Sequence, residues 1–301
     1  MEEDIMANYE HILYEKQRGG VLITLNAPER MNSINPDMEN ELHEALDEAD
    51  KDPDVRAIIL TGAGRAFSSG YQMGRADNSR SSTVWPYGLP EGTSIAEQLD
   101  ATRRRDRVGM EKFMHLWELS TPVIAAVNGW AVGGGSWYAV ACHMTIASEE
   151  AVFAQPEVRH ISNTSFFWTL AAGYKHALRY SLTGDHIDAT EALRIGIVNK
   201  VVSSDDLLDE CFNIVERIAK ISPETIKVNL FVTTQGLEMM GLRNALSLGA
   251  EFSSIVHVSQ REDFKGHLNE AQSTGGVRAF LQERDGPFQP EPFGPRSKPR
   301  K

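Results

Sequence analysis

Two glycine-containing turns in this sequence could each direct a backbone N–H group at a negatively charged oxygen. The first is Gly133-Gly134-Gly135, which stands between a predicted strand and a predicted helix. Glycines at such a junction let the backbone approach a ligand closely, and the unpaired N–H groups at the start of a helix point toward negative charge. The same glycines are equally consistent with close packing between the strand and the helix.

A second turn of this kind lies at residues 66–71 and follows a predicted strand through Gly62-Ala63-Gly64. Because both turns leave the C-terminal ends of strands, each could offer one N–H group to the same oxygen. Two such donors form an oxyanion hole, which stabilises the negative charge that develops on a substrate carbonyl. The two turns together favour a catalytic site more than either turn alone.

Among the side chains, His160 could serve as a general acid or base because the pKa of histidine lies near neutrality. The sequence indicates no partner for it, so a structural or surface histidine is the favoured interpretation. Ser162 and Ser165 lack a recognisable catalytic triad, and we expect them to be capping or loop residues.

Alternating strands and helices are needed to position the two turns, and the sequence predicts them. Asn35 is a suitable N-cap ahead of Pro36 at the first position of a helix. Strand, helix and strand at this spacing indicate right-handed crossover units and hence the α/β fold class, although no sequence repeat accompanies them. Strands are expected at residues 21–25, 55–62, 122–127 and 144–147, and helices at residues 35–49 and 136–143.

Three further segments differ in composition from these strands and helices. Residues 74–102 are polar and are expected to form a long loop that is either functional or mobile. The last third of the chain, from residue 205, is dominated by helical periodicity. After Asp285 the chain is rich in proline and ends in basic residues, among them Arg296, and we expect this tail to be disordered.

The composition is that of a protein with an ample core and a negative charge. Lys and Arg number 30 against 42 Asp and Glu, which gives a formal net charge of −12, and 41% of the residues are hydrophobic. Global disorder is therefore excluded, and general binding of nucleic acid or of an anionic membrane is disfavoured. The two cysteines, Cys142 and Cys211, are too few for a disulfide framework or a zinc cluster, so we expect a reducing compartment and no metal site. Because the N-terminus is acidic and no apolar run is long enough to span a bilayer, we expect a soluble, cytoplasmic protein.

Several strings in the sequence occur in an order that is typical of one protein family. The longest are LTGAGRAFSSG at residues 60–70, PVIAAVNGWAVGGG at residues 122–135 and FAQPE at residues 153–157. Shorter matches are LTG at residues 182–184, ATEAL at 189–193, GIVN at 196–199, EDF at 262–264 and GVRAF at 276–280. Together they resemble the crotonase (enoyl-CoA hydratase/isomerase) superfamily, from about residue 9 to residue 288.

This resemblance implies a spiral of ββα turns over residues 9–205 and a helical region used for trimer assembly at residues 206–286, with residues 287–301 as the disordered tail. It implies an acyl-CoA thioester as substrate, with CoA as part of the substrate rather than a separate cofactor, and a homotrimer or homohexamer. The backbone N–H groups of Tyr71 and Gly134 match the two oxyanion donors of the family. For this role the side chain at position 71 is expected to matter little.

The resemblance also assigns acid–base chemistry to Glu157. Hydratases of the family carry two glutamates, one matching Glu157 and one at the position that is Trp137 here. Two carboxylates hold and activate water for addition to a double bond, whereas one carboxylate is sufficient to move a proton between two carbons. We therefore expect a double-bond shift, as in the enoyl-CoA isomerases of the family. Hydration stays close behind, and hydrolysis, C–C cleavage and a non-catalytic CoA-binding role stay open.

Aromatic residues and one histidine are candidates for the substrate pocket. Trp137, His160 and Phe166 are the residues expected to line it. Phe166 begins an aromatic set with Phe167 and Trp168 that could shape an apolar acyl pocket, and core packing explains this set equally well.

The CoA moiety is polyanionic, so its attraction to an acidic protein must be local. By the same resemblance, Arg30 is the cation available in the segment that contacts CoA, and Ser69 and Gly70 are further candidates for CoA binding. A second basic cluster at residues 103–107 is expected on a helix, and a solvated helix face is the favoured interpretation.

Overall fold

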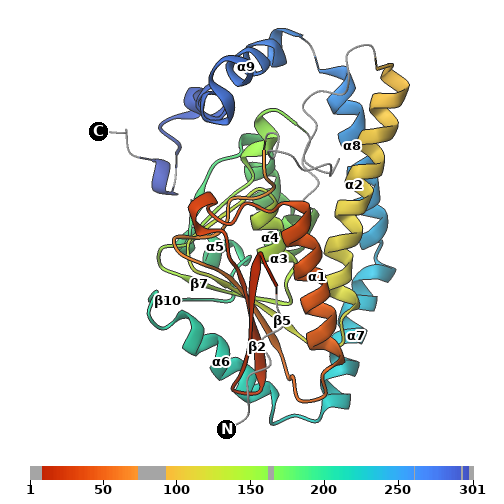
Figure 1. Ribbon diagram of the computed structural model, residues 1–301, viewed down its shortest axis with the longest axis vertical. Helices are drawn as coiled ribbons and strands as arrows, with labels where there is room; N and C mark the ends of the chain where they lie inside the picture. Colours follow the sequence, from red (N-terminus) through yellow and green to blue (C-terminus); the bar gives the residue numbers. More distant parts are fainter. Residues whose placement is uncertain (1–8, 74–92, 162–165, 261, 293, 298–301) are drawn as a thin grey trace.

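The computed structural model describes residues 9–73, 93–161, 166–260, 262–292 and 294–297. Its main sheet has six strands in the order β1-β2-β3-β5-β7-β10, of which Figure 1 labels β2, β5, β7 and β10. β1 pairs antiparallel with β2, and the other neighbouring strands are parallel. The strands are β1 (Ile12–Gln17), β2 (Gly20–Leu25), β3 (Ile58–Gly62), β5 (Val123–Val127), β7 (Met144–Ser148) and β10 (Lys200–Val202).

A second sheet has the strand order β4-β6-β8-β9, and its first three strands follow one another in the same chain order as β3, β5 and β7 of the main sheet. β3 leads to β4 and α2 (Ile95–Glu118), β5 to β6 and α3, and β7 to β8, η2 and α4. Because β4, β6 and β8 are parallel neighbours just as β3, β5 and β7 are, the predicted spiral of ββα turns is confirmed. The elements are β4 (Ala66–Ser68), β6 (Trp130–Val132), α3 (Gly134–Ala141), β8 (Val152–Ala154), η2 (Pro156–Arg159), α4 (Phe166–Thr183), β9 (Ile187–Asp188) and α5 (Ala189–Ile195).

Helix α1 (Pro36–Lys51) begins as the sequence predicts. The Asn35 side chain accepts a hydrogen bond of 2.7 Å from the amide of Met38, and Pro36 stands at the first helical position. Its buried apolar face packs in the same core as β2 and β3. β1 was not predicted, because only Ile12 and Tyr14 of its residues are buried and they form no continuous apolar run.

The segment at residues 74–102 is only partly the loop that we expected. Helix α2 (Ile95–Glu118) already begins at Ile95, so the prediction is wrong for residues 95–102. The helix starts there because Ser94 and Glu97 form a capping box: the Ser94 hydroxyl accepts from the Glu97 amide, and the Glu97 carboxylate accepts from the Ser94 amide. Residues 74–92 lie outside the described residues.

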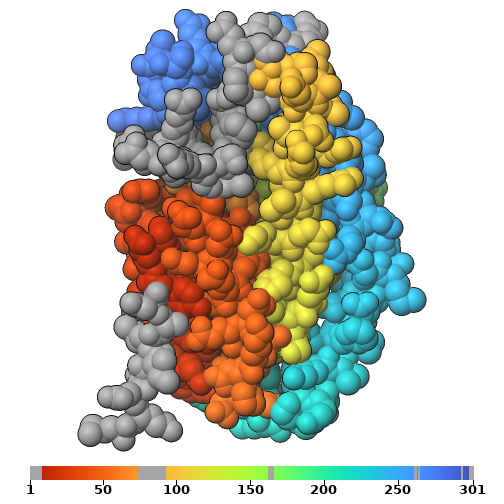
Figure 2. All heavy atoms as spheres, turned by 45° about the vertical axis from the view of Figure 1, so that its right-hand side comes forward, coloured from red at the N-terminus to blue at the C-terminus, as the bar shows by residue number. Residues whose placement is uncertain are grey.

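Residues 206–286 are mostly helical, and two of their helices border α2. α6 packs on one face of the main sheet, against residues of β3, β5 and β7. α2 (yellow) lies between α1 (orange) and the pair α7 and α8 (cyan to blue) in Figure 2. Within the described part of the chain, no helix combines the length and the apolar character needed to cross a bilayer. The helices are α6 (Leu207–Ile218), α7 (Pro223–Met239), α8 (Leu242–Ser259) and α9 (Glu262–Asp285).

The tail after Asp285 is folded over its described residues, so the expectation of disorder is wrong there. Short 3₁₀ turns occur at η3 (Gly286–Phe288) and η4 (Gly294–Arg296). Glu291 is buried and pairs with Arg159, and Arg296 lies 3.6 Å from Asp285. A proline-rich composition indicates little capacity for a core, but a buried ion pair with the body anchors this segment.

Candidate active site

The two glycine turns meet in the structure. Gly70 has a φ of +90°, and a Cβ placed on it would lie 3.0 Å from the Gly134 nitrogen and 2.6 Å from the Val132 carbonyl oxygen. Only glycine allows both this backbone conformation and this approach. Among the described residues, the Tyr71 amide donates no backbone hydrogen bond outside the helices and strands, and Gly134 is the first residue of α3, where a helix leaves its N–H group unpaired. The two predicted oxyanion donors are therefore adjacent and available.

Glu157 lies beside the same turns. It follows β8 in the 3₁₀ turn η2, which Pro156 begins, and a Cβ on Gly133 would lie 3.5 Å from its Oε2 atom. The residue is 9% exposed, and neither carboxylate oxygen has a hydrogen-bond partner among the described residues. Burial raises the pKa of Glu157 to about 7, since the charged form is deprived of water. A carboxyl group with this pKa can both take up and release a proton near neutral pH.

Trp137 stands at the position where the family resemblance predicts the second carboxylate of a hydratase. Its amide donates to the Gly133 carbonyl at 3.0 Å, which places the side chain one helical turn into α3. The indole is 6% exposed and donates to the Gln155 side chain at 3.3 Å. Its ring centroid lies 6.4 Å from that of Tyr71 and 5.9 Å from that of Phe113. An apolar ring thus stands beside the oxyanion turn in place of a group that could hold water.

His160 supports the turn that carries Glu157. Its amide donates to the Glu157 carbonyl at 2.9 Å, and its ring packs edge-on against Phe280. Burial lowers the pKa of His160 to about 3, so the imidazole is neutral at physiological pH. This supports the structural interpretation of His160 over acid–base catalysis, while its place in a substrate pocket stays a prediction.

The aromatic set at the start of α4 divides into core and partly exposed residues. Phe167 is buried against Phe113 and Trp117, and Trp168 is fully buried with its indole nitrogen donating to Ser136. Phe166 is only half-buried and is the member that remains a pocket candidate. Ser162 and Ser165 lie outside the described residues.

The three candidates for CoA binding are neighbours. The Ser69 amide donates to the Met31 carbonyl at 2.9 Å, and its hydroxyl lies 3.4 Å from the Arg30 carbonyl. Gly70 and Tyr71 follow directly, so Arg30 projects from a loop that touches the oxyanion turn. The Arg30 side chain is 60% exposed and lies 3.5 Å from Glu29. A role for Arg30, Ser69 and Gly70 in CoA binding stays a prediction.

The sequence pattern did not identify two polar residues that support the site. Asn32 is fully buried, and its amide group binds backbone atoms of Ala27, Ala63 and Ala66, which ties the Arg30 loop to the turn before β4. Glu39 of α1 accepts hydrogen bonds from the Tyr71 and Tyr138 hydroxyls. A signal for the second was present, because Glu39, His43 and Asp47 recur every four residues on one helix face.

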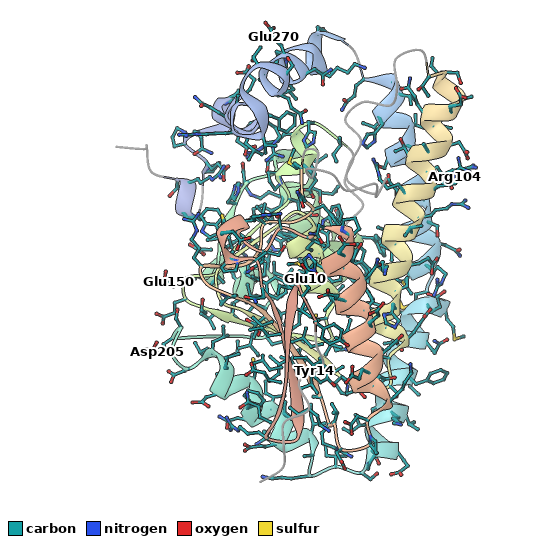
Figure 3. All side chains as sticks on the ribbon, viewed as in Figure 1. Glu10, Tyr14, Arg104, Glu150, Asp205 and Glu270 are labelled. Atoms are coloured by element: carbon teal, nitrogen blue, oxygen red, sulfur yellow. The ribbon has the colours of Figure 1, made fainter. Side chains whose placement is uncertain are left out.

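The basic cluster at residues 103–107 lies on α2, as expected. Arg104 points away from the protein in Figure 3, and its side chain is 74% exposed beside Asp100. Arg107 pairs with Glu251, while Arg105 is largely buried against Asp106. Most of the cluster is thus a solvated helix face. Across the described residues, no group of three or more His, Cys, Asp or Glu side chains is arranged to hold a metal ion.

Known proteins share the sequence pattern and the overall fold of this chain. The family model for enoyl-CoA hydratase/isomerase matches residues 15–290. The chain belongs to this family, within the crotonase superfamily. This is a family of enzymes. The relatives of this chain include proteins named as hydratases and proteins named as isomerases.

Three relatives illustrate the range of activities that are named within this family. An enoyl-CoA hydratase/isomerase of Xanthobacter autotrophicus Py2 is 31% identical with a TM-score of 0.77, over 93% of this chain and 99% of that chain. A monofunctional enoyl-CoA isomerase of M. smegmatis is 34% identical with a TM-score of 0.60, over 78% of this chain and 98% of that chain. A short-chain-enoyl-CoA hydratase of Clostridium acetobutylicum is 31% identical over 76% of this chain and 82% of its own length.

Proposed function

We propose that the protein catalyses a double-bond shift in an enoyl-CoA thioester. The observation that carries this proposal is Glu157, a buried carboxyl group with a pKa near 7 beside the paired oxyanion turns, with Trp137 where a second carboxylate would stand. One acid–base group and two N–H donors are the minimum for moving a proton along an enolate. The kinship to a protein named as an enoyl-CoA isomerase supports the same reaction.

The proposed reaction runs through a dienolate. The Glu157 carboxylate removes a proton from C2 of a 3-enoyl-CoA, and the electron pair of that C–H bond moves onto the thioester oxygen. The amides of Tyr71 and Gly134 hold this oxygen, and each such donor contributes about 3 to 4 kcal/mol in comparable sites. The protonated Glu157 then returns the proton to C4 as the double bond moves to C2. Trp137 keeps water away from the dienolate.

Hydration of a 2-enoyl-CoA is the second candidate. The kinship to a protein named as a short-chain-enoyl-CoA hydratase favours it. In that reaction a group other than a carboxylate at position 137 would have to hold the attacking water. The isomerase proposal is preferred because an indole there offers no proton acceptor.

The experiment compares wild type, Glu157→Gln and the control Glu150→Gln, whose side chain is exposed on the turn between β7 and β8. Short, long, aromatic and cyclic 2-enoyl- and 3-enoyl-CoA thioesters are followed by absorbance and by mass. Isomerisation changes the absorbance of the conjugated thioester at constant mass, and we expect Glu157→Gln to lose it while CoA binding and the control stay intact. A product that gains water would favour hydration, and release of free thiol would favour hydrolysis. Full turnover in Glu157→Gln, or tight CoA binding without any product, would overturn the proposal.

We also propose that the protein assembles as a homotrimer or a dimer of trimers. α7, α8 and the turn between them expose large apolar side chains, which in a monomer would lie in water: Phe231, Val232, Met239, Met240, Leu248 and Phe252. Light scattering of the purified protein measures the mass of the assembly directly. A monomer at micromolar concentration would contradict this proposal without affecting the catalytic one.

A further inference from the structure

One carboxylate oxygen accepts hydrogen bonds from the hydroxyl groups of two tyrosines. The Tyr71 and Tyr138 hydroxyls each donate to Oε1 of Glu39, both at 2.7 Å. Glu39 lies in the first turn of α1, whereas Tyr71 follows β4 and Tyr138 lies in α3. Glu39 thus joins three segments that are distant in the sequence.

The two tyrosines belong to the two elements that supply the oxyanion donors. Tyr71 carries one donor amide itself, and Tyr138 lies one helical turn after Gly134, the residue with the other donor amide. The Tyr71 ring also touches Gly134 directly, because a Cβ placed there would lie 2.7 Å from two ring carbons. The position of the Tyr71 phenol therefore sets the distance between the two donor elements.

We propose that Glu39 is a positioning residue of the oxyanion hole, which holds the Tyr71 and Gly134 amides at the spacing that one thioester oxygen requires. This inference rests on the proposed function only in assuming that the two amides bind the thioester oxygen. It gives the side chain at position 71 a role that donation by the backbone amide alone does not require.

The hydrogen bonds beyond Tyr138 have directions that keep this arrangement fixed. The Tyr138 hydroxyl gives its hydrogen to Glu39, so it accepts from Nε2 of His43 at 2.9 Å. Burial lowers the pKa of His43 to about 2, so its ring is neutral and its Nδ1 atom accepts from Nδ1 of His115 at 2.7 Å. The Nε2 atom of His115 lies 2.8 Å from Asp47, and it donates to this carboxylate when the His115 ring carries a proton on both nitrogens. The chain of bonds connects Glu39 to α2 and returns to α1.

Both tyrosines stay donors over the whole range in which the enzyme can be assayed. Burial and the neighbouring Glu39 raise the pKa of Tyr71 and of Tyr138 well above 10. The two hydroxyls therefore remain protonated, and Glu39 keeps two donors.

The test removes the acceptor and each donor separately. Glu39→Leu, Tyr71→Phe and Tyr138→Phe are compared with Glu39→Gln, which keeps an acceptor oxygen, and with the control Glu44→Gln, which is exposed on the same helix. We expect kcat to fall about tenfold in the first three variants with KM changed less than twofold, below the roughly hundredfold loss that a misplacement of 1 Å can cause. Glu39→Gln should stay within about threefold of wild type, since it can still accept both hydroxyls.

A spectroscopic readout separates positioning from general loss of structure. The absorption of a bound aromatic enoyl-CoA moves to longer wavelength when the thioester carbonyl is polarised by the two amides. We expect this red shift to shrink in Tyr71→Phe and in Glu39→Leu. The melting temperature of Tyr71→Phe should equal that of wild type, because this variant conserves the ring. A full red shift and wild-type kcat in Tyr71→Phe and Tyr138→Phe would overturn the inference, as would an equal loss in Glu39→Gln and Glu39→Leu.

The results that would contradict this inference differ from those that would contradict the proposed function. Glu157→Gln should lose turnover but keep the red shift, because it leaves the two amides in place. Turnover in Glu157→Gln with a reduced red shift in Tyr71→Phe would overturn the assigned reaction and support the role of Glu39.

Discussion

Arg159 and Glu291 form an ion pair of 3.0 Å in which both side chains are almost wholly shielded from water. Arg159 lies two residues after Glu157 in the same 3₁₀ turn, and it also pairs with Asp285 at 3.1 Å. Glu291 in addition accepts from the amide of His186 at 2.7 Å. Glu291, in the described part of the C-terminal segment, therefore holds in place the turn that carries Glu157, the proposed acid–base group.

Glu291→Gln is expected to destabilise the protein. Removal of one partner of a buried ion pair typically costs 3–5 kcal/mol, and we expect about 3 kcal/mol here because Asp285 still pairs with Arg159. Urea denaturation measures the loss, with the exposed Glu283→Gln as the control. Equal stability of the two variants would show that the tail contributes little to the fold.

The activity of the enzyme is expected to rise with pH through an apparent pKa near 7. In the proposed reaction Glu157 acts first as a base, so it must be ionised, and burial holds its pKa at about 7 instead of the usual value near 4.5. Below pH 6 most molecules carry a protonated Glu157 that cannot remove a proton. The dependence of kcat/KM on pH checks this, and a profile that is flat from pH 5 to 8 would contradict it.

Glu157→Gln is expected to stabilise the protein at high pH. The raised pKa means that the folded state holds a proton that the unfolded state has lost, so wild-type stability falls as pH rises from 4.5 through about 7. The variant lacks this penalty, which amounts to about 3 kcal/mol for a shift of this size. Urea denaturation at pH 4 and pH 8 should give no difference at pH 4 and the full gain at pH 8. An equal difference at both pH values would mean that ionisation is not its cause.

Gly134→Ala is expected to disable the oxyanion hole. The added Cβ would lie 2.7 Å from the Tyr71 ring, so the ring and the donor amide beside it must move, and we expect a loss of about a hundredfold in kcat. The double variant with Tyr71→Ala should recover part of the activity because it removes the clash. Gly236→Ala is the control, since an added Cβ there meets no atom within 4 Å. A double variant no better than Gly134→Ala would place the damage elsewhere.

Arg30→Ala is expected to weaken CoA binding without slowing the chemical step. An exposed arginine contributes about 1 kcal/mol to an ionic contact, which corresponds to roughly a fivefold rise in KM at constant kcat. The control is Arg104→Ala on the solvated face of α2 (Figure 3). Equal KM values for both variants would remove Arg30 from the CoA site.

The two glycine turns were predictable because their cause is local. A glycine between a strand and a helix indicates backbone conformations and close approaches that other residues do not tolerate, and Gly70 and Gly133 have such conformations. Asn35 before Pro36 likewise identifies the start of α1 from neighbouring residues alone. Glu157 is different, because a lone glutamate has no local signature, and only the resemblance of its segment to a family singled it out.

The contacts that support the site were not predictable from local pattern. Glu39 and Tyr71 are 32 residues apart, and Arg159 and Glu291 are 132 residues apart. Each pair forms only because the tertiary fold brings α1 to the oxyanion turn and the tail to η2. The composition of the tail was even misleading, since prolines and basic residues are typical of disorder while one buried carboxylate decides its placement.

The strand spacing of the second sheet sets the distances between the groups of the proposed site. Tyr71, Gly134 and Glu157, which carry the two proposed donor amides and the proposed acid–base group, each lie within three residues of the end of β4, β6 and β8 respectively. These three strands are consecutive neighbours in the second sheet. Neighbouring strands lie about 4.8 Å apart in every sheet, so the spacing of these groups follows from backbone hydrogen bonding. The helical connections between the strands can therefore lengthen or change sequence, and with them the shape of the acyl pocket, while the distances that the reaction needs stay the same.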